Sequence, residues 1–230
     1  MEQQGPDRRW IVLAVFAVIA VGVVAAVLIS RRGGSDESSS ASATEAGAGG
    51  CRKVEAPAPK NVSFKAPKQV LKSGEEATAV VKTSCGTFDI ALDTKRAPKT
   101  ANSFAFLAEE GFYDELTFHR VAPGFVIQGG DPKGDGTGGP GYTVTEKPPA
   151  NLAYTKGTVA MAKSSADPPG RSGSQFFVVT AADAGLPPEY ALLGKVSKGY
   201  ATVARIEKLG TPEEKPKQTV LIEEVTVERG

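Results

Sequence analysis

The chain of 230 residues has little of what metal sites and nucleic-acid surfaces need. It contains one histidine and two cysteines, and its 27 basic residues nearly balance 26 acidic ones. The resulting net charge of +1 provides no extended positive field, so no nucleic-acid partner is expected. The few histidines and cysteines cannot complete a four-ligand metal site without carboxylates at suitable spacing, which the sequence lacks. We therefore expect neither a metal nor a cofactor.

Long apolar runs are also scarce, with one exception at residues 10–29, WIVLAVFAVIAVGVVAAVLI. At 1.5 Å per residue this run spans roughly 30 Å, the hydrocarbon thickness of a bilayer. It is longer than the apolar core of about 7 to 15 residues in a cleaved signal peptide, which is the alternative interpretation. The run predicts a transmembrane helix over residues 10–30, in contact with the lipid bilayer, after an N-terminal tail of residues 1–9.

The orientation of this helix is not set by its flanking charges, because two arginines precede it and two follow it. The short N-terminal tail and the two cysteines favour a single-pass cell-membrane protein whose later residues lie outside the cytoplasm. The alternative topology keeps these residues at the cytoplasmic face of the membrane.

After the apolar run the composition changes twice. Residues 33–60 contain no aromatic residue and few large apolar ones, so they cannot bury enough surface to offset the entropy of ordering. We predict a flexible linker rich in Ser, Ala, Gly and Pro over residues 31–70 and a folded domain over residues 71–230.

Short stretches of β-branched and aromatic residues, separated by Gly and Pro, dominate the predicted domain. Eight strand candidates argue for a mainly β fold, either a closed or nearly closed β-barrel or a sandwich. They are ATAVVKT, TFDIALD, LTFHRVA, FVIQ, GTVAMA, QFFVVT, ALLGKV and QTVLIEEVTVE. The hydrophobic phase of the last stretch changes near Glu223 and Glu224, which predicts a bulge there.

Two predicted helices interrupt this pattern of strands. The first begins at Pro98, which suits a first helical position, and can end at Gly111. The second covers residues 200–208 and ends where Gly210 is followed by Thr-Pro.

Residues 134–139 satisfy the G-x-G-x-x-G pattern of dinucleotide-binding loops. That pattern binds a pyrophosphate only where a helix follows the glycines. Here Pro140 and Gly141 follow instead, so nucleotide binding is not predicted.

Residues 118–131, FHRVAPGFVIQGGD, and 173–177, GSQFF, resemble the cyclophilin family of peptidyl-prolyl cis/trans isomerases. The resemblance extends over about residues 78–228 and includes a glycine-rich loop of the length found in bacterial members. It implies a mainly β fold, an eight-stranded antiparallel closed β-barrel capped by two α-helices, which agrees with the pattern of elements above. It also implies an enzyme that accelerates protein folding on polypeptides containing X-Pro bonds.

The resemblance also assigns roles to individual side chains. Arg120, Phe125 and Gln128 are expected to be catalytic, with Arg120 as the hydrogen-bond donor. The expected substrate-binding residues are Val126, Ala162, Lys163, Gln175, Phe177, Leu186 and Tyr190. His119 is interpreted as structural, because no serine or cysteine nucleophile signature accompanies it.

Two positions depart from the family pattern. Gly185 and Tyr190 stand where many relatives carry Trp and His. Because that Trp contributes to cyclosporin binding in the family, we expect cyclosporin to bind this chain more weakly. A non-catalytic proline-binding module or holdase on the same scaffold is the alternative function.

Cys51 lies within the predicted linker and Cys85 in the first predicted hairpin. A disulfide between them would close a loop of about 34 residues and stabilise the fold by roughly 4 kcal/mol in the chain-entropy model. We favour this disulfide; two free thiols in a reducing compartment are the alternative.

Overall fold

The computed structural model describes residues 50–230. The predicted tail, transmembrane helix and first part of the linker lie outside the described residues. Between residues 50 and 230, no helix combines the length and the hydrophobicity needed to cross a bilayer.

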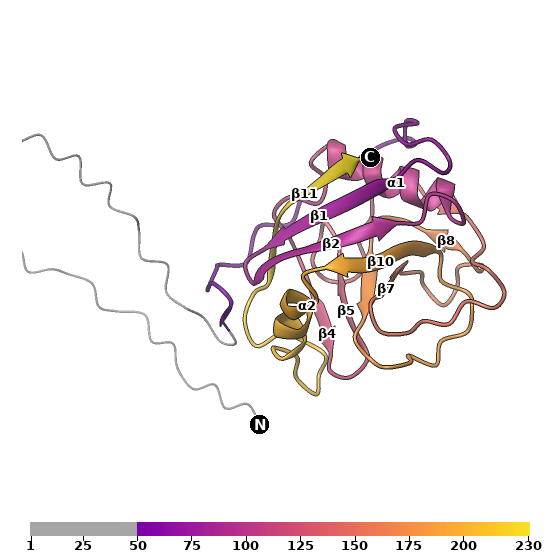
Figure 1. Cartoon of the computed structure of the whole chain (residues 1–230). Coiled ribbons are helices and arrows are strands. Elements are labelled where there is room, and N and C mark those ends of the chain that lie inside the picture. The colour runs from indigo at the N-terminus through magenta and orange to yellow at the C-terminus, as the bar shows by residue number, and fades with distance from the viewer. Residues whose placement is uncertain (1–49) are drawn as a thin grey trace, which may run out of the picture. The chain divides into compact units, whose positions relative to one another are not determined.

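The domain is built on one curled antiparallel sheet (Figure 1) with the strand order β3-β11-β1-β2-β10-β7-β9-β5-β4. A separate pair, β6 and β8, forms a two-stranded sheet. The strands of the large sheet are Ala77–Thr83 (β1), Gly86–Leu92 (β2), Leu116–Thr117 (β3), Arg120–Ala122 (β4), Val126–Gly129 (β5), Thr158–Met161 (β7), Phe176–Val179 (β9), Leu192–Lys198 (β10) and Leu221–Arg229 (β11). The small sheet pairs Val144–Thr145 (β6) with Arg171–Ser172 (β8).

The mainly β prediction is confirmed, but the eight-stranded closed barrel is not found. The stretch predicted as one strand, LTFHRVA, is divided into β3 and β4, which form the two edges of the nine-stranded sheet. The division occurs because the chain changes partners there: Phe118 N bonds to Val220 O, whereas Val121 N bonds to Glu214 O. Within residues 50–230, no ladder joins the edge strands, so the sheet curls round without closing.

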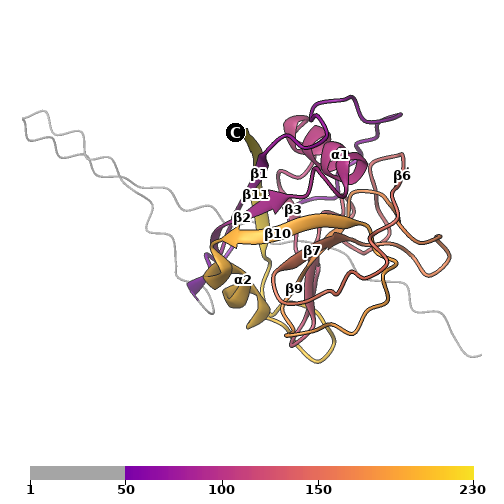
Figure 2. The same ribbon diagram turned by 45° about the vertical axis from the view of Figure 1, so that its right-hand side comes forward.

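Two helices cover opposite ends of the curled sheet, as Figures 1 and 2 both show. Helix α1 spans Pro98–Glu109, with Pro98 at its start as predicted, and it buries Ala101, Phe104 and Ala105. Helix α2 spans Tyr200–Glu207. The predicted bulge is also confirmed, since the β1–β11 register passes from Lys82 opposite Glu224 to Thr83 opposite Ile222.

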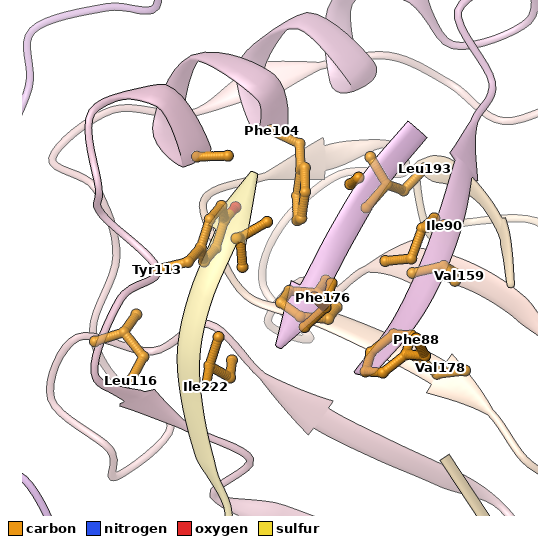
Figure 3. Packing of buried hydrophobic residues seen from close by; sticks show 14 of the residues in the cluster. Phe88, Ile90, Phe104, Tyr113, Leu116, Val159, Phe176, Val178, Leu193 and Ile222 are labelled. Atoms are coloured by element: carbon orange, nitrogen blue, oxygen red, sulfur yellow. The ribbon is translucent and has the colours of Figure 1, made fainter. Parts of the chain in front are cut away.

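The main core fills the concave side of the sheet beneath α1. Phe104 stacks on Tyr113 at 4.7 Å between ring centroids and meets the edge of Phe176 at 5.5 Å. Figure 3 shows these rings beside aliphatic side chains that come from several strands of the large sheet. Labelled there are Phe88, Ile90, Phe104, Tyr113, Leu116, Val159, Phe176, Val178, Leu193 and Ile222. This packed interior supports the strands that carry the site on their other face.

Residues 50–71, which we call the strap, contain no helix longer than one turn and no strand of the sheets, yet they contact the domain closely. Cys51 is fully buried and forms a disulfide with Cys85. Farther along, Phe64 packs its ring on Phe106 at 5.3 Å. The predicted flexible linker over residues 31–70 included the strap, but the contacts of residues 50–70 attach this part to the domain.

Candidate active site

Strand alternation gives the sheet two different faces along β5, β7 and β9. Ile127, Val159, Phe176 and Val178 point into the main core, while the alternate residues form a second apolar cluster. This second cluster contains Ala122, Val126, Tyr154, Ala160, Phe177 and Val179. The period of two along each strand therefore builds a core on one face and a pocket on the other.

The register of four neighbouring strands places the polar and apolar parts of this face side by side. Arg120 pairs with Gln128 across β4 and β5, and Gln128 pairs with Phe177 across β5 and β9. Phe177 in turn pairs with Ala160 of β7, which lies beside β9 in Figure 2. Cross-strand partners project from the same side of a sheet, so a guanidinium, an amide and an aromatic ring form one row.

An apolar pocket of about 130 Å³ opens over this row. Its lining brings together nine of the ten predicted site residues: Arg120, Phe125, Val126, Gln128, Ala162, Lys163, Phe177, Leu186 and Tyr190. Phe177 meets Tyr190 edge to face, with 5.5 Å between the ring centroids. The pocket has the size and the apolar walls to receive one small ring.

The guanidinium of Arg120 stands at the rim of the apolar pocket and is fixed by three contacts. Its Nη1 donates to Gln128 Oε1 at 3.2 Å, and its Nε donates to Glu214 Oε2 at 2.6 Å. Its Cζ lies 5.7 Å from the centre of the Phe125 ring. One third of the Arg120 side chain remains exposed, so its donors can reach a bound ligand.

The tenth predicted residue, Gln175, lies next to the pocket. Gln128 Nε2 donates to Gln175 Oε1 at 3.0 Å. Gln175 lines a larger groove of about 690 Å³, which shares Gln128, Ala162 and Lys163 with the apolar pocket. The two hollows are therefore continuous, and an extended ligand seated in the pocket has room to continue into the groove.

Lys163 stands where the pocket meets the groove. Its side chain is only 6% exposed, and its Nζ lies 3.3 Å from the carboxylate of Glu189. The same Nζ lies 5.6 Å from the ring centroid of Tyr190. These contacts hold a cation beside the pocket without placing it inside.

Sequence reasoning missed two residues that shape this site. Glu214 reaches Arg120 from a loop 94 residues away, which no local pattern signals. Tyr154 is fully buried; its hydroxyl donates to Tyr190 O at 2.6 Å and accepts from Tyr190 N at 3.0 Å. Burial raises the pKa of Tyr154 to about 12, so the hydroxyl stays protonated and able to make both bonds.

The remaining sequence predictions concern His119, Gly185 and metals. His119 lies beside the site residue Arg120, and burial lowers its pKa. Its Nδ1 has no hydrogen-bond partner within the part of the chain that the structure describes. Gly185 adopts a φ of 62°, and a Cβ placed there would have no other atom within 4 Å beyond its chain neighbours, so no side chain walls the pocket at this position. Among residues 50–230 no group of three or more potential metal ligands occurs.

Comparison with known proteins points to one family. The model of the family described as "Cyclophilin type peptidyl-prolyl cis-trans isomerase/CLD" matches residues 78–227. A protein of Neurospora crassa named peptidyl-prolyl cis-trans isomerase-like 1 is 38% identical over 154 residues, covering 65% of this chain and 93% of the relative. Peptidyl-prolyl cis-trans isomerase B of Streptomyces anulatus is also 38% identical, covering 67% of this chain and 98% of the relative.

The fold gives the same result. The structure of a cyclophilin-type isomerase from Cryptosporidium parvum, solved in the presence of the dipeptide Ala-Pro, superposes with a TM-score of 0.61. It shares 30% sequence identity and covers 66% of this chain and 99% of its own. The chain therefore belongs to the cyclophilin-type peptidyl-prolyl cis/trans isomerases and is an enzyme of that class.

Proposed function

We propose that the apolar pocket binds the proline ring of an X-Pro peptide and that Arg120 lowers the barrier to rotation about its amide bond. The observation that carries this proposal is the guanidinium fixed at the rim of an apolar pocket by Gln128 and Glu214. The Ala-Pro dipeptide in the Cryptosporidium relative supports a proline-containing substrate.

The chemistry of the bond explains why such a site suffices. Rotation about a peptide bond costs about 18–20 kcal/mol, because the nitrogen lone pair is delocalised into the carbonyl. A donor aimed at the amide nitrogen favours the pyramidal nitrogen of the twisted state over the planar ground state. Arg120 supplies this donor, while Phe125 and Phe177 hold the ring and Gln128 positions the guanidinium and the substrate backbone. The reaction needs no covalent intermediate.

The direct test removes the donor. Arg120→Ala is expected to lower kcat/KM by about 10²-fold, comparable with the removal of one preorganised donor in other enzymes. Arg96→Ala is the matched control, because Arg96 is an exposed arginine paired with Asp93 outside the pocket. A protease-coupled assay with X-Pro peptides measures both variants. Full activity in a folded Arg120→Ala variant would contradict the mechanism.

A second candidate function is a proline-binding module or holdase with little turnover. The Tyr at position 190 and the missing side chain at Gly185 favour it, because both alter the pocket wall relative to the family pattern. The two functions separate in the same assay. A module would bind X-Pro peptides in a titration without accelerating their isomerisation.

In the cell, we place the isomerase domain on the extracytoplasmic side of a membrane, where it would accelerate folding of exported or cell-surface proteins. The disulfide between Cys51 and Cys85 supports an oxidising compartment, and the apolar run of residues 10–29 supports an anchor. The test labels Cys51 and Cys85 with a thiol reagent that cannot cross membranes, first in intact cells and then in lysates. Free thiols that react only after lysis would defeat this topology.

The open wall at Gly185 also bears on drug binding. Without an aromatic side chain there, cyclosporin loses contact area, so we expect weaker inhibition than in relatives that carry Trp. Gly185→Trp is expected to increase the inhibition at some cost in stability, because the φ of 62° at this position disfavours a residue with a side chain. Equal inhibition of the two proteins would argue against this account.

A further inference from the structure

The strap lies outside the segment that matches the family, which begins at residue 78, yet it is attached to the domain at several points. At its start Cys51 is bonded to Cys85, and Arg52 pairs with Glu223. At its end the buried side chain of Asn102 accepts hydrogen bonds from Val70 N and Leu71 N, and it donates to Lys68 O. These attachments fix the path of residues 52–68 along the surface.

Between these two ends, the strap touches the loop that forms one wall of the groove. We call residues 131–141 the groove loop. Lys60 N donates to Pro132 O, and Phe64 N donates to Pro140 O, both at 2.8 Å. The strap therefore holds the groove loop by the backbone near both of its ends.

Side-chain packing tightens this contact. Phe64 places its ring against Phe106 at 5.3 Å and Phe112 at 6.3 Å, which anchors the strap in the core beneath α1. Gly141 has a φ of 86°, and a Cβ there would lie 2.0 Å from Ser63 Oγ. The strap and the groove loop are thus fitted to each other at this glycine.

The groove loop passes this support on to the site. Gln175 Nε2 donates to Gly136 O at 3.0 Å and to Gly138 O at 2.9 Å. Gln175 then accepts from Gln128, and Gln128 accepts from Arg120. Hydrogen bonds at each end, joined by the backbone of the groove loop, therefore connect the strap to the guanidinium.

We propose that the strap is a positioning element of the active site and that Phe64 and Lys60 are its positioning residues. By fixing the groove loop, they set the width of the groove and the orientation of the Gln175 and Gln128 amides. The inference rests on the proposed function, because it assumes that the substrate residues next to X-Pro bind in the groove. The enzyme's preference for those substrate residues would then depend on the strap, which lies outside the segment that matches the family.

The main test compares three variants of the full chain. Phe64→Ala removes the anchoring ring, Phe64→Leu keeps an apolar side chain, and Val62→Ala changes an exposed strap residue as the matched control. Kinetics are measured with X-Pro peptides extended stepwise on either side. Phe64→Ala is expected to lower kcat/KM by about three- to tenfold for peptides that reach the groove, and by less than about twofold for the shortest peptide. Phe64→Leu should recover most of the loss.

A second readout does not depend on turnover. The side-chain amide resonances of Gln175 and Gln128 are recorded by NMR without substrate. Phe64→Ala is expected to shift them and to speed the exchange of the Gln175 amide protons with water, whereas Val62→Ala leaves them unchanged. Because this readout is independent of catalysis, it tests the strap even if Arg120→Ala were to overturn the proposed function.

A further pair of variants covers the case in which Phe64→Ala does not fold. Lys60→Pro removes the N–H that donates to Pro132 O, whereas Lys60→Ala keeps it. Both variants lose the bond from Lys60 Nζ to Asp114 O, so the comparison isolates the backbone N–H. Relative to Lys60→Ala, Lys60→Pro is expected to shift the Gln175 amide and to lower kcat/KM on long peptides by about threefold. Unchanged Gln175 resonances and an unchanged peptide series in folded variants at both positions would overturn the proposal.

Discussion

Arg120 donates from Nε to the carboxylate of Glu214 at 2.6 Å, while its other edge donates to Gln128. Glu214 adopts a φ of 60°, a left-handed conformation that is uncommon for a residue with a side chain. The loop thus holds an acidic residue in an unfavoured backbone geometry, and its carboxylate orients the guanidinium from the side away from Gln128.

We predict that Glu214→Ala lowers kcat/KM by about three- to tenfold, mainly through kcat, because the guanidinium loses one of its two hydrogen-bond acceptors. The ion pair is partly exposed, so its loss should change the free energy of unfolding by only about 0–1 kcal/mol. Glu214→Gln keeps an acceptor and should recover most of the activity. Steady-state kinetics and thermal unfolding measure the two effects, and an unchanged kcat in Glu214→Ala would show that Gln128 alone suffices.

Tyr154 holds the Tyr190 backbone through both its N–H and its C=O. Tyr154→Phe leaves both groups without this partner, which should cost about 1–3 kcal/mol of stability. We also expect KM to rise more than kcat falls, because Tyr190 walls the apolar pocket. Urea unfolding and peptide kinetics test this. If the Tyr154→Phe variant keeps the stability and the KM of the wild type, the hydroxyl has no positioning role.

The raised pKa of Tyr154 also leads us to expect a loss of stability at alkaline pH. Its pKa is raised to about 12 in the folded state, against about 10 in an unfolded chain. The stabilising contribution is complete below pH 10 and is lost as the pH rises toward 12, because only the unfolded state ionises in that window. Burial also raises the pKa of Tyr113 and Tyr142. The urea midpoint should therefore fall from pH 10 to 12 in every variant, but less steeply in Tyr154→Phe.

The disulfide predicts a large effect on stability. Cys51 and Cys85 are 34 residues apart, so replacing both with alanine should lower the free energy of unfolding by about 4 kcal/mol in the chain-entropy model. Urea unfolding at neutral pH measures it. Reduced wild-type protein is the control and should lose a similar amount. A loss below about 1 kcal/mol would mean that the unfolded chain gains little freedom when the bond is absent.

The pH dependence of the rate tests whether the single histidine, His119, takes part in catalysis. Burial lowers the pKa of His119, so it is neutral around pH 7, and stability should fall as the pH drops through the ordinary histidine value of about 6.5. Arginine and glutamine side chains do not titrate between pH 6 and 9, so kcat/KM should stay flat there. The titration of the one imidazole is followed by NMR beside the kinetics. A rate that tracked this titration would assign His119 a catalytic role.

Much of the fold could be predicted because its signals are local. Pro98 starts α1, and the change of hydrophobic phase near Glu223 marks the bulge. The stretch from Leu116 to Ala122 could not be divided correctly from its composition. Its two halves have the same β-forming character, and only the partners Val220 and Glu214 decide that they lie on opposite edges.

The candidate site shows the same limit. Four of the nine predicted residues in the pocket come together because they lie on neighbouring strands of fixed register: Arg120, Val126, Gln128 and Phe177. The other five lie outside the strands, and only the resemblance to the family indicated them. Glu214, Tyr154 and the strap contacts of Phe64 depend on tertiary neighbours, and their sequence surroundings carry no distinguishing pattern. The linker prediction considered composition alone, so it did not detect one aromatic residue that docks on the core.

The position of β11 joins parts of the chain that are far apart in the sequence. This strand spans Leu221–Arg229, yet it lies between β3 and β1 and pairs along its length with residues 77–83. Chain entropy must be lost to bring such distant segments together before their contacts stabilise them. The pairing of β11 with β1 therefore raises the contact order of the domain, which slows folding relative to sheets built from consecutive hairpins.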